Sequence, residues 1–137
     1  MEWYRDEFVI SDDRSRVQVE AVAELLAKTF WGHRRPRAVV EKLIQTSMCF
    51  SILRKQEQVG FARVVTDSAV FSWLSDVVIK DACRGRGLGE WLIGCILEHP
   101  QISGTQFVLQ TTDAAGLYKK FGFLVNDKLM ARKPSTW

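Results

Sequence analysis

Apolar and polar residues follow two different periods in the first third of the chain. A short apolar run predicts a strand over residues 7–10, with a polar turn at residues 11–13. Apolar residues then recur at helical spacing, which predicts a first helix over residues 15–30; they are Val19, Val22, Ala23, Leu26, Ala27 and Phe30. A second helix is predicted over residues 36–46, because proline suits the first helical turn.

The middle of the chain is typical of an antiparallel meander. Strands are predicted over residues 48–53, 59–65 and 69–79, which are rich in β-branched and aromatic residues. Polar segments at residues 55–58 and 66–68 separate them and predict turns.

In the last third of the chain, apolar residues again recur at helical spacing. A helix is predicted over residues 87–98, ending before Pro100. A strand is predicted over residues 107–110, and we expect it to pair in parallel with the strand at 69–79, because a helix lies between the two in the chain.

A short helix carrying Tyr118 is expected next, with Asp113 as its N-cap, and then a final strand over residues 123–132. Together these elements predict an α/β (α+β) fold in which a mixed, mostly antiparallel sheet has helices on both faces. With 137 residues, we expect residues 1–137 to form a single domain.

Composition narrows the class of protein. The hydrophobic content is 47%, and no apolar run approaches the ~18 residues that span a membrane, so no membrane partner is expected. The net charge of +3 is too small to indicate a nucleic-acid partner. Neither a signal-peptide pattern nor C-x-x-C spacing of the 3 cysteines is present, and we therefore expect a cytoplasmic protein without a metal site.

The Arg/Gly segment at residues 84–89 lies where a strand leads into a helix. Glycines without side chains let backbone N–H groups face a ligand, and the positive end of a helix dipole lies at the same place. Two arginines add charge where phosphate oxygens would lie. The segment, Arg84-Gly85-Arg86-Gly87-Leu88-Gly89, therefore predicts a site for a phosphate or diphosphate.

Two matches identify what this anion site resembles. The segment lacks the residues of a P-loop or of a dinucleotide-binding fingerprint. Its pattern Arg84-x-x-Gly87-x-Gly89 instead resembles the acyl-CoA loop of the GCN5-related N-acetyltransferase (GNAT) family. The segment at residues 114–123 resembles the family's closing motif, an Ala-containing helix with a Tyr that ends in Gly-Phe. The resemblance covers residues 48–125 well and the first third in general layout.

The resemblance implies acetyl-CoA as co-substrate and a direct attack by an amine on the thioester. Backbone groups of Val77, Val78 and Ile79 would bond the pantetheine arm as an added strand does, and residues 84–89 would hold the diphosphate. Tyr118 would protonate the departing thiolate. Thr111 stands where many members carry an Asn that helps to hold this arm. For residues 77–79 the alternative is an ordinary buried strand. For residues 84–89 it is an exposed turn at the start of a helix, and for Tyr118 it is a tyrosine of the core.

The general base and the acceptor site are less well marked. Trp73 stands where some members place a Glu base, and Asp76 is the nearby candidate, although strand alternation places it on the face opposite Trp73, Ser75 and Val77. A structural pairing of Asp76 is the alternative. Trp31 and His33, in the aromatic and cationic loop 31–37, and Trp73 are candidate acceptor contacts. They suggest an acceptor with an acidic or planar group, unless the loop is only a solvated basic segment.

The sequence therefore predicts an acetyl-CoA-dependent N-acetyltransferase that acts on a primary amine of a small molecule or peptide. The alternative is a non-catalytic acyl-CoA-binding or regulatory module on the same fold. The final strand and Trp137 could also form the interface of a homodimer.

Overall fold

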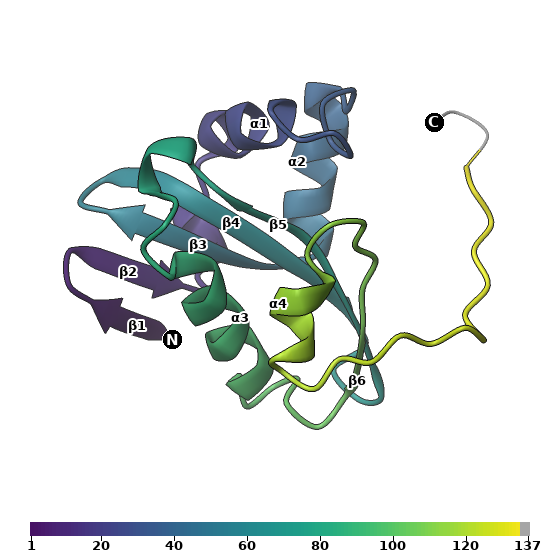
Figure 1. The fold of residues 1–137 in the computed structure, drawn as a ribbon. Coiled ribbons are helices and arrows are strands. Elements are labelled where there is room, and N and C mark those ends of the chain that lie inside the picture. The colour runs from purple at the N-terminus through teal and green to yellow at the C-terminus, as the bar shows by residue number, and fades with distance from the viewer. Residues whose placement is uncertain (135–137) are drawn as a thin grey trace.

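A curled, six-stranded mixed sheet forms the centre of the computed structural model, which describes residues 1–134 (Figure 1). Neighbouring strands are antiparallel except β5 and β6, which pair in parallel as predicted. In sheet order, the strands are β1 (Glu2–Arg5), β2 (Phe8–Ser11), β3 (Met48–Arg54), β4 (Glu57–Thr66), β5 (Phe71–Ile79) and β6 (Gln106–Val108).

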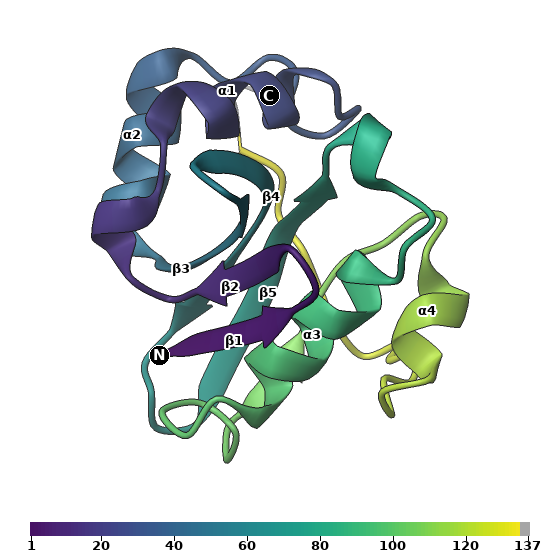
Figure 2. The same ribbon diagram turned by 90° about the vertical axis from the view of Figure 1, so that its left-hand side faces the viewer.

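Helices cover both faces of this sheet, which confirms the predicted fold class (Figure 2). On one face, α1 and α2 pack against Phe61 and Val78. On the other face, α3 packs against Ala62 and Leu74. The α-helices are α1 (Val19–Ala27), α2 (Arg37–Thr46), α3 (Leu88–Glu98) and α4 (Ala115–Lys119), and the 3-10 helices are η1 (Arg14–Arg16) and η2 (Asp81–Cys83). None of the helices in residues 1–134 is long and apolar enough to cross a membrane.

The N-terminal third differs from the sequence prediction in two places. Strand β1 was not predicted, because most of its side chains are exposed and leave no apolar alternation to detect. The first helix is shorter than predicted: Asp13 caps the separate helix η1 by accepting the N–H of Ser15, and the chain then runs extended through Val17 and Gln18 before α1 begins.

The predicted final strand over residues 123–132 is wrong. The chain leaves the sheet after α4, and residues 123–132 contain no strand (Figure 1). Leu124, Val125 and Met130 are 84–94% exposed, because apolar residues form a strand only where a sheet edge pairs with them. Trp137, the other part of the predicted dimer interface, lies outside the described residues.

Asp113 is not the N-cap of the helix that carries Tyr118. The N-cap is Ala114, whose backbone N–H donates to the hydroxyl of Thr111 at 2.9 Å. The helix starts one residue later than predicted and has no side-chain cap, and the Thr111 hydroxyl instead holds the turn that precedes it.

Candidate functional site

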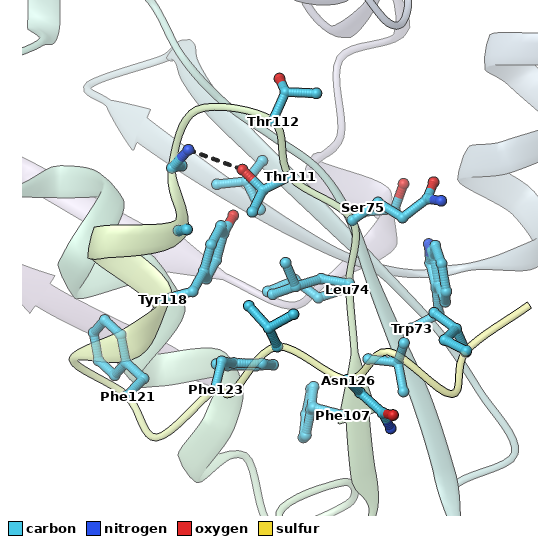
Figure 3. Close-up of a pocket in the computed structure, with 18 of the residues that line it drawn as sticks. Trp73, Leu74, Ser75, Phe107, Thr111, Thr112, Tyr118, Phe121, Phe123 and Asn126 are labelled. Carbon is cyan, nitrogen blue, oxygen red and sulfur yellow. Dashed lines mark hydrogen bonds between the residues drawn. The ribbon is translucent and has the colours of Figure 1, made fainter.

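A cavity of about 1170 Å³ opens where β5 and β6 separate (Figure 3). The two strands pair from Phe71 opposite Gln106 to Trp73 opposite Val108, and β5 then continues to Ile79 with no further partner in β6 among the described residues. The unpaired part of β5 lies beside a space large enough for a ligand. The predicted site residues that line this cavity are Trp31, Trp73, Asp76, Val77, Thr111 and Tyr118.

A β-bulge in β5 changes the direction of Asp76. Between the pairs Phe61–Val78 and Arg63–Ser75, β4 advances by two residues while β5 advances by three. Leu74 and Val78, which strict alternation would place on one face, therefore pack into the cores on opposite faces of the sheet. The prediction from alternation is wrong for Asp76, because the additional residue brings it to the face of Ser75.

The Asp76 carboxylate is fully enclosed by donors from two other elements. Arg35 Nη1 donates to its Oδ1 at 2.7 Å and its Oδ2 at 2.8 Å, and Arg63 Nε donates to Oδ2 at 2.6 Å. Trp31 Nε1 donates to Oδ1 at 2.9 Å. The side chain of Asp76 is 0% exposed, so these three donors replace all of its water.

This environment makes Asp76 a weak proton acceptor. Burial by itself would raise the pKa of Asp76, but the hydrogen bonds and charges of Arg63 and Arg35 outweigh it, and the pKa lies below 3.8. A general base for an amine needs a much higher proton affinity near neutral pH. The geometry therefore argues against the predicted role of base and supports the alternative of a structural pairing.

Asp76 also adopts an uncommon backbone conformation, with φ of 54°. Aspartate tolerates this left-handed region better than most residues, although it costs about 1 kcal/mol or more unless the surroundings hold it. Here the bulge and the three donors fix the residue in place. The sequence gives no local signal for this arrangement, since Arg35 and Arg63 are distant in the chain, and sequence reasoning missed both as its partners.

The two predicted acceptor residues of loop 31–37 lie in different surroundings. Trp31 lines the cavity, whereas His33 is exposed, is not among the cavity residues, and has its Nδ1 3.0 Å from the carbonyl oxygen of Phe30. Arg35 lines the cavity as well, through its bonds to Asp76. The loop therefore contributes to the cavity lining one aromatic ring, that of Trp31, and one cation, Arg35, whose charge is paired with Asp76.

The glycine segment, residues 84–89, connects η2 with α3 beyond the end of β5 and is not part of the cavity lining. Gly85 and Gly87 have φ of 81° and 74°, the left-handed region that favours glycine. An added Cβ at Gly85 or Gly89 would meet no atom within 4 Å. The backbone conformation therefore favours glycine at positions 85 and 87, and packing requires it at neither position 85 nor position 89.

The remaining residues of this segment have defined positions. Leu88 is buried in the core, and Arg84 and Arg86 are exposed, in ion pairs with Asp81 at 3.3 Å and Glu7 at 3.1 Å. Exposed pairs of this kind are weak, so both guanidinium groups can turn to another anion at little cost.

Tyr118 extends from α4 into the cavity (Figure 3). Its ring packs against the main core and meets Phe123 edge-on, with the ring centroids 5.7 Å apart. Burial, and secondarily the charge of Asp113, raises the pKa of Tyr118 above 10. The phenol is therefore protonated at neutral pH and can donate a hydrogen bond.

Comparison with known proteins agrees with these features. Residues 45–125 match a family model described as an acetyltransferase (GNAT) domain. A crystal structure from Xanthomonas campestris pv. campestris, of a protein assigned to the GNAT family, has a TM-score of 0.89 and 34% identity, covering 94% of each chain. A protein from Gibberella zeae assigned as an acetyltransferase is 28% identical over 142 residues, which cover 86% of this chain and 79% of that protein.

More distant relatives share the fold. Glucosamine-6-phosphate N-acetyltransferase from Arabidopsis thaliana has a TM-score of 0.68 at 14% identity, which is a likeness of fold alone. The family model matches more than half of the chain, and it includes the glycine segment, the cavity strands and Tyr118. The chain thus belongs to the GNAT family of acetyltransferases.

Proposed function

We propose that this protein transfers an acetyl group from acetyl-CoA to the primary amine of a small molecule or peptide. The observation that carries the proposal is the separation of β5 from β6 after Trp73, next to a glycine segment and in a cavity that contains Tyr118. An unpaired strand edge, an anion site and a proton donor are what this transfer would need.

The glycine segment fits the diphosphate of coenzyme A. Space is open at Gly85 and Gly89, and the N-terminal turn of α3 begins there. Backbone N–H groups at the start of a helix favour an anion. Arg84 and Arg86 lie in the same segment and would add charge-assisted hydrogen bonds.

The unpaired end of β5 fits an extended chain with amide groups. Residues Val77 and Ile79 lie beyond the last pair with β6, so their backbone groups on that side would bond the pantetheine arm as an added strand. Val78, between them, pairs with Phe61 of β4 and is buried against α1 and α2, which holds this part of the strand in place. Thr111 lines the cavity, and its hydroxyl holds the turn before α4 by accepting the Ala114 N–H.

When bound, acetyl-CoA supplies a thioester carbonyl that a neutral amine can attack directly. Tyr118 holds a proton on its phenolic oxygen at neutral pH, as any tyrosine does, and burial raises its pKa further. That proton would pass to the sulfur as the C–S bond breaks, and the proton that the amine loses when the C–N bond forms would replace it. Asp76 would act as a positioning residue that holds Trp31 and Arg35 against the cavity.

Replacing Tyr118 tests this proposal against the non-catalytic alternative. For Tyr118→Phe we expect kcat to fall about 100-fold, as for loss of a general acid. Its affinity for CoA should stay near that of the wild type, because the ring remains. The measurements are thiol release from acetyl-CoA with a panel of amines and calorimetric titration with CoA.

The other tyrosine of the chain provides the matched control. Tyr4 is 71% exposed on β1 and bonds to Glu2, so Tyr4→Phe should leave both measurements unchanged. A wild-type protein that gives no heat with acetyl-CoA would overturn the proposal. Heat with CoA but no turnover of any amine would favour the binding module.

A further inference from the structure

Aromatic side chains from two segments of the chain line the cavity. Phe71 and Trp73 lie two positions apart on β5 and therefore point to the same face of the sheet. Phe30 and Trp31 come from the segment after α1, and their rings meet edge-on with centroids 5.0 Å apart. These four residues are called the aromatic wall below. Three of them, Phe30, Trp31 and Phe71, are 40–61% exposed. Contact of such large apolar rings with water is unfavourable, and an exposed apolar patch often marks a binding site.

Trp31, one residue of the aromatic wall, is held in place before any ligand binds. The indole N–H of Trp31 donates to the buried Asp76 carboxylate at 2.9 Å, and Arg35 from the same loop bonds both oxygens of that carboxylate. Asp76 is in turn bonded to Arg63 of β4. Trp31 is thus fixed to the sheet while part of its ring stays exposed, which is the arrangement of a preorganised contact surface.

The charged groups beside Trp31, which are Asp76 and Arg35, are already paired with each other. Asp76 and Arg35 bond each other, so the wall presents no uncompensated carboxylate to a second ammonium group. The other acidic residue of the lining, Asp113, belongs to the turn before α4 beside Tyr118, not to the wall. Arg37, the first residue of α2, is bonded to Glu20 and Glu41, which weakens the case for an acidic acceptor.

We infer that the acceptor is a primary amine joined by a short linker to an aromatic or other flat apolar group. This inference rests on the proposed function and names its substrate class. The flat group would lie against Trp31 and Trp73, where ring–ring contacts add to the burial of apolar surface. The amine would then extend toward Ser75 and Val77, at the end of the cavity where β5 loses its partner.

A matched set of amines tests the inference. We expect kcat/KM for 2-phenylethylamine to exceed that for 1,4-diaminobutane and for glucosamine 6-phosphate by at least about tenfold, measured as thiol release from acetyl-CoA. Calorimetric titration of the protein with 2-phenylethylamine, without acetyl-CoA, gives a second readout. It should show binding that 1,4-diaminobutane does not show.

Two substitutions separate the ring of Trp31 from its N–H group. For Trp31→Leu we expect KM for 2-phenylethylamine to rise about tenfold with little change in the affinity for CoA, because a ring contact is lost. Trp31→Phe keeps a ring and should recover most of the loss. Tyr4→Leu, at an exposed aromatic residue on β1 outside the cavity lining, is the control and should change neither quantity.

The outcomes distinguish the two levels of the proposal. If 1,4-diaminobutane or glucosamine 6-phosphate is the better acceptor, or if Trp31→Leu leaves KM unchanged, the substrate class is wrong while the acetyltransferase function stands. If CoA gives no heat and no amine releases thiol, the proposed function itself fails.

Discussion

The two ends of the candidate site are built in different ways. The glycine segment consists of six consecutive residues, and its shape depends on main-chain conformation at Gly85 and Gly87. The acceptor end depends on side chains that meet at Asp76 from positions 45, 41 and 13 residues away: Trp31, Arg35 and Arg63. A main-chain site can therefore be recognised in a sequence, whereas a site of distant side chains cannot.

This difference also implies that a substitution at one end of the site should leave the function of the other end intact. A change at Gly89 should affect CoA binding without loosening the fold, since Gly89 has no positive φ and open space surrounds it. A change at Asp76 should affect the stability of the protein and the acceptor end, since buried charges meet there. Single substitutions can therefore impair one end at a time.

The largest effect is expected for Asp76→Asn. Removing the charge leaves Arg35 and Arg63 without their buried counter-ion, and loss of one partner of a buried pair typically costs about 3–5 kcal/mol. Urea denaturation should show this loss in the free energy of unfolding. The folded fraction should keep most of its affinity for CoA.

Asp127→Asn is a suitable control, because Asp127 is exposed in the segment after α4. Equal stability of Asp76→Asn and the control would contradict the role given to the buried carboxylate. A loss of CoA affinity as large as the loss of acceptor affinity would show that the two ends are not separate.

A smaller effect is expected for Gly89→Ala. Gly89 lies in the first turn of α3, where alanine favours the helix and an added Cβ meets no atom within 4 Å. The methyl group would occupy space that the diphosphate needs. We expect the Kd for CoA to rise about tenfold without loss of thermal stability.

Gly104→Ala provides the matched control, because Gly104 also has open space around it but lies in the loop between α3 and β6. Calorimetry should give a wild-type Kd for this variant. A wild-type Kd for Gly89→Ala as well would remove the glycine segment from the binding site.

The smallest effect is expected at acid pH. The pKa of Asp76 in the folded protein lies below its ordinary value of 3.8. The pairing therefore stabilises the fold fully above pH 3.8, and this stabilisation is lost as the pH falls through the folded pKa. Denaturation of wild type and Asp76→Asn near pH 7 and about pH 3 should show the difference in stability narrowing at the lower pH. A constant difference would contradict the assigned shift.

Local patterns predicted most of the elements around the site. The helical period over residues 87–98 corresponds to α3, and the prediction for residues 36–46 corresponds to α2. The apolar strands β3, β4 and β5 also lie within a few residues of their predicted bounds. One face of each of these segments is buried, so the spacing of their apolar residues along the chain indicates which face contacts the core.

Predictions failed where burial did not follow the local pattern. Strand β1 is mostly exposed and was missed, while the apolar residues at 124–130 were assigned to a strand although the chain leaves the sheet there. Alternation placed Asp76 on the wrong face, because a bulge adds one residue to β5. No local signal marks this bulge, since its charged partners lie in other elements.

The sequence by itself determined the family, the glycine segment and the placement of Tyr118 on a short helix. These features depend on neighbouring residues whose conformational preferences act locally. Only the tertiary structure decided that Asp76 is an anchor with a low pKa and that Trp31 is fixed against the cavity. Both depend on which distant donors reach a buried carboxylate, since desolvation and pairing are set by the three-dimensional surroundings of a charge.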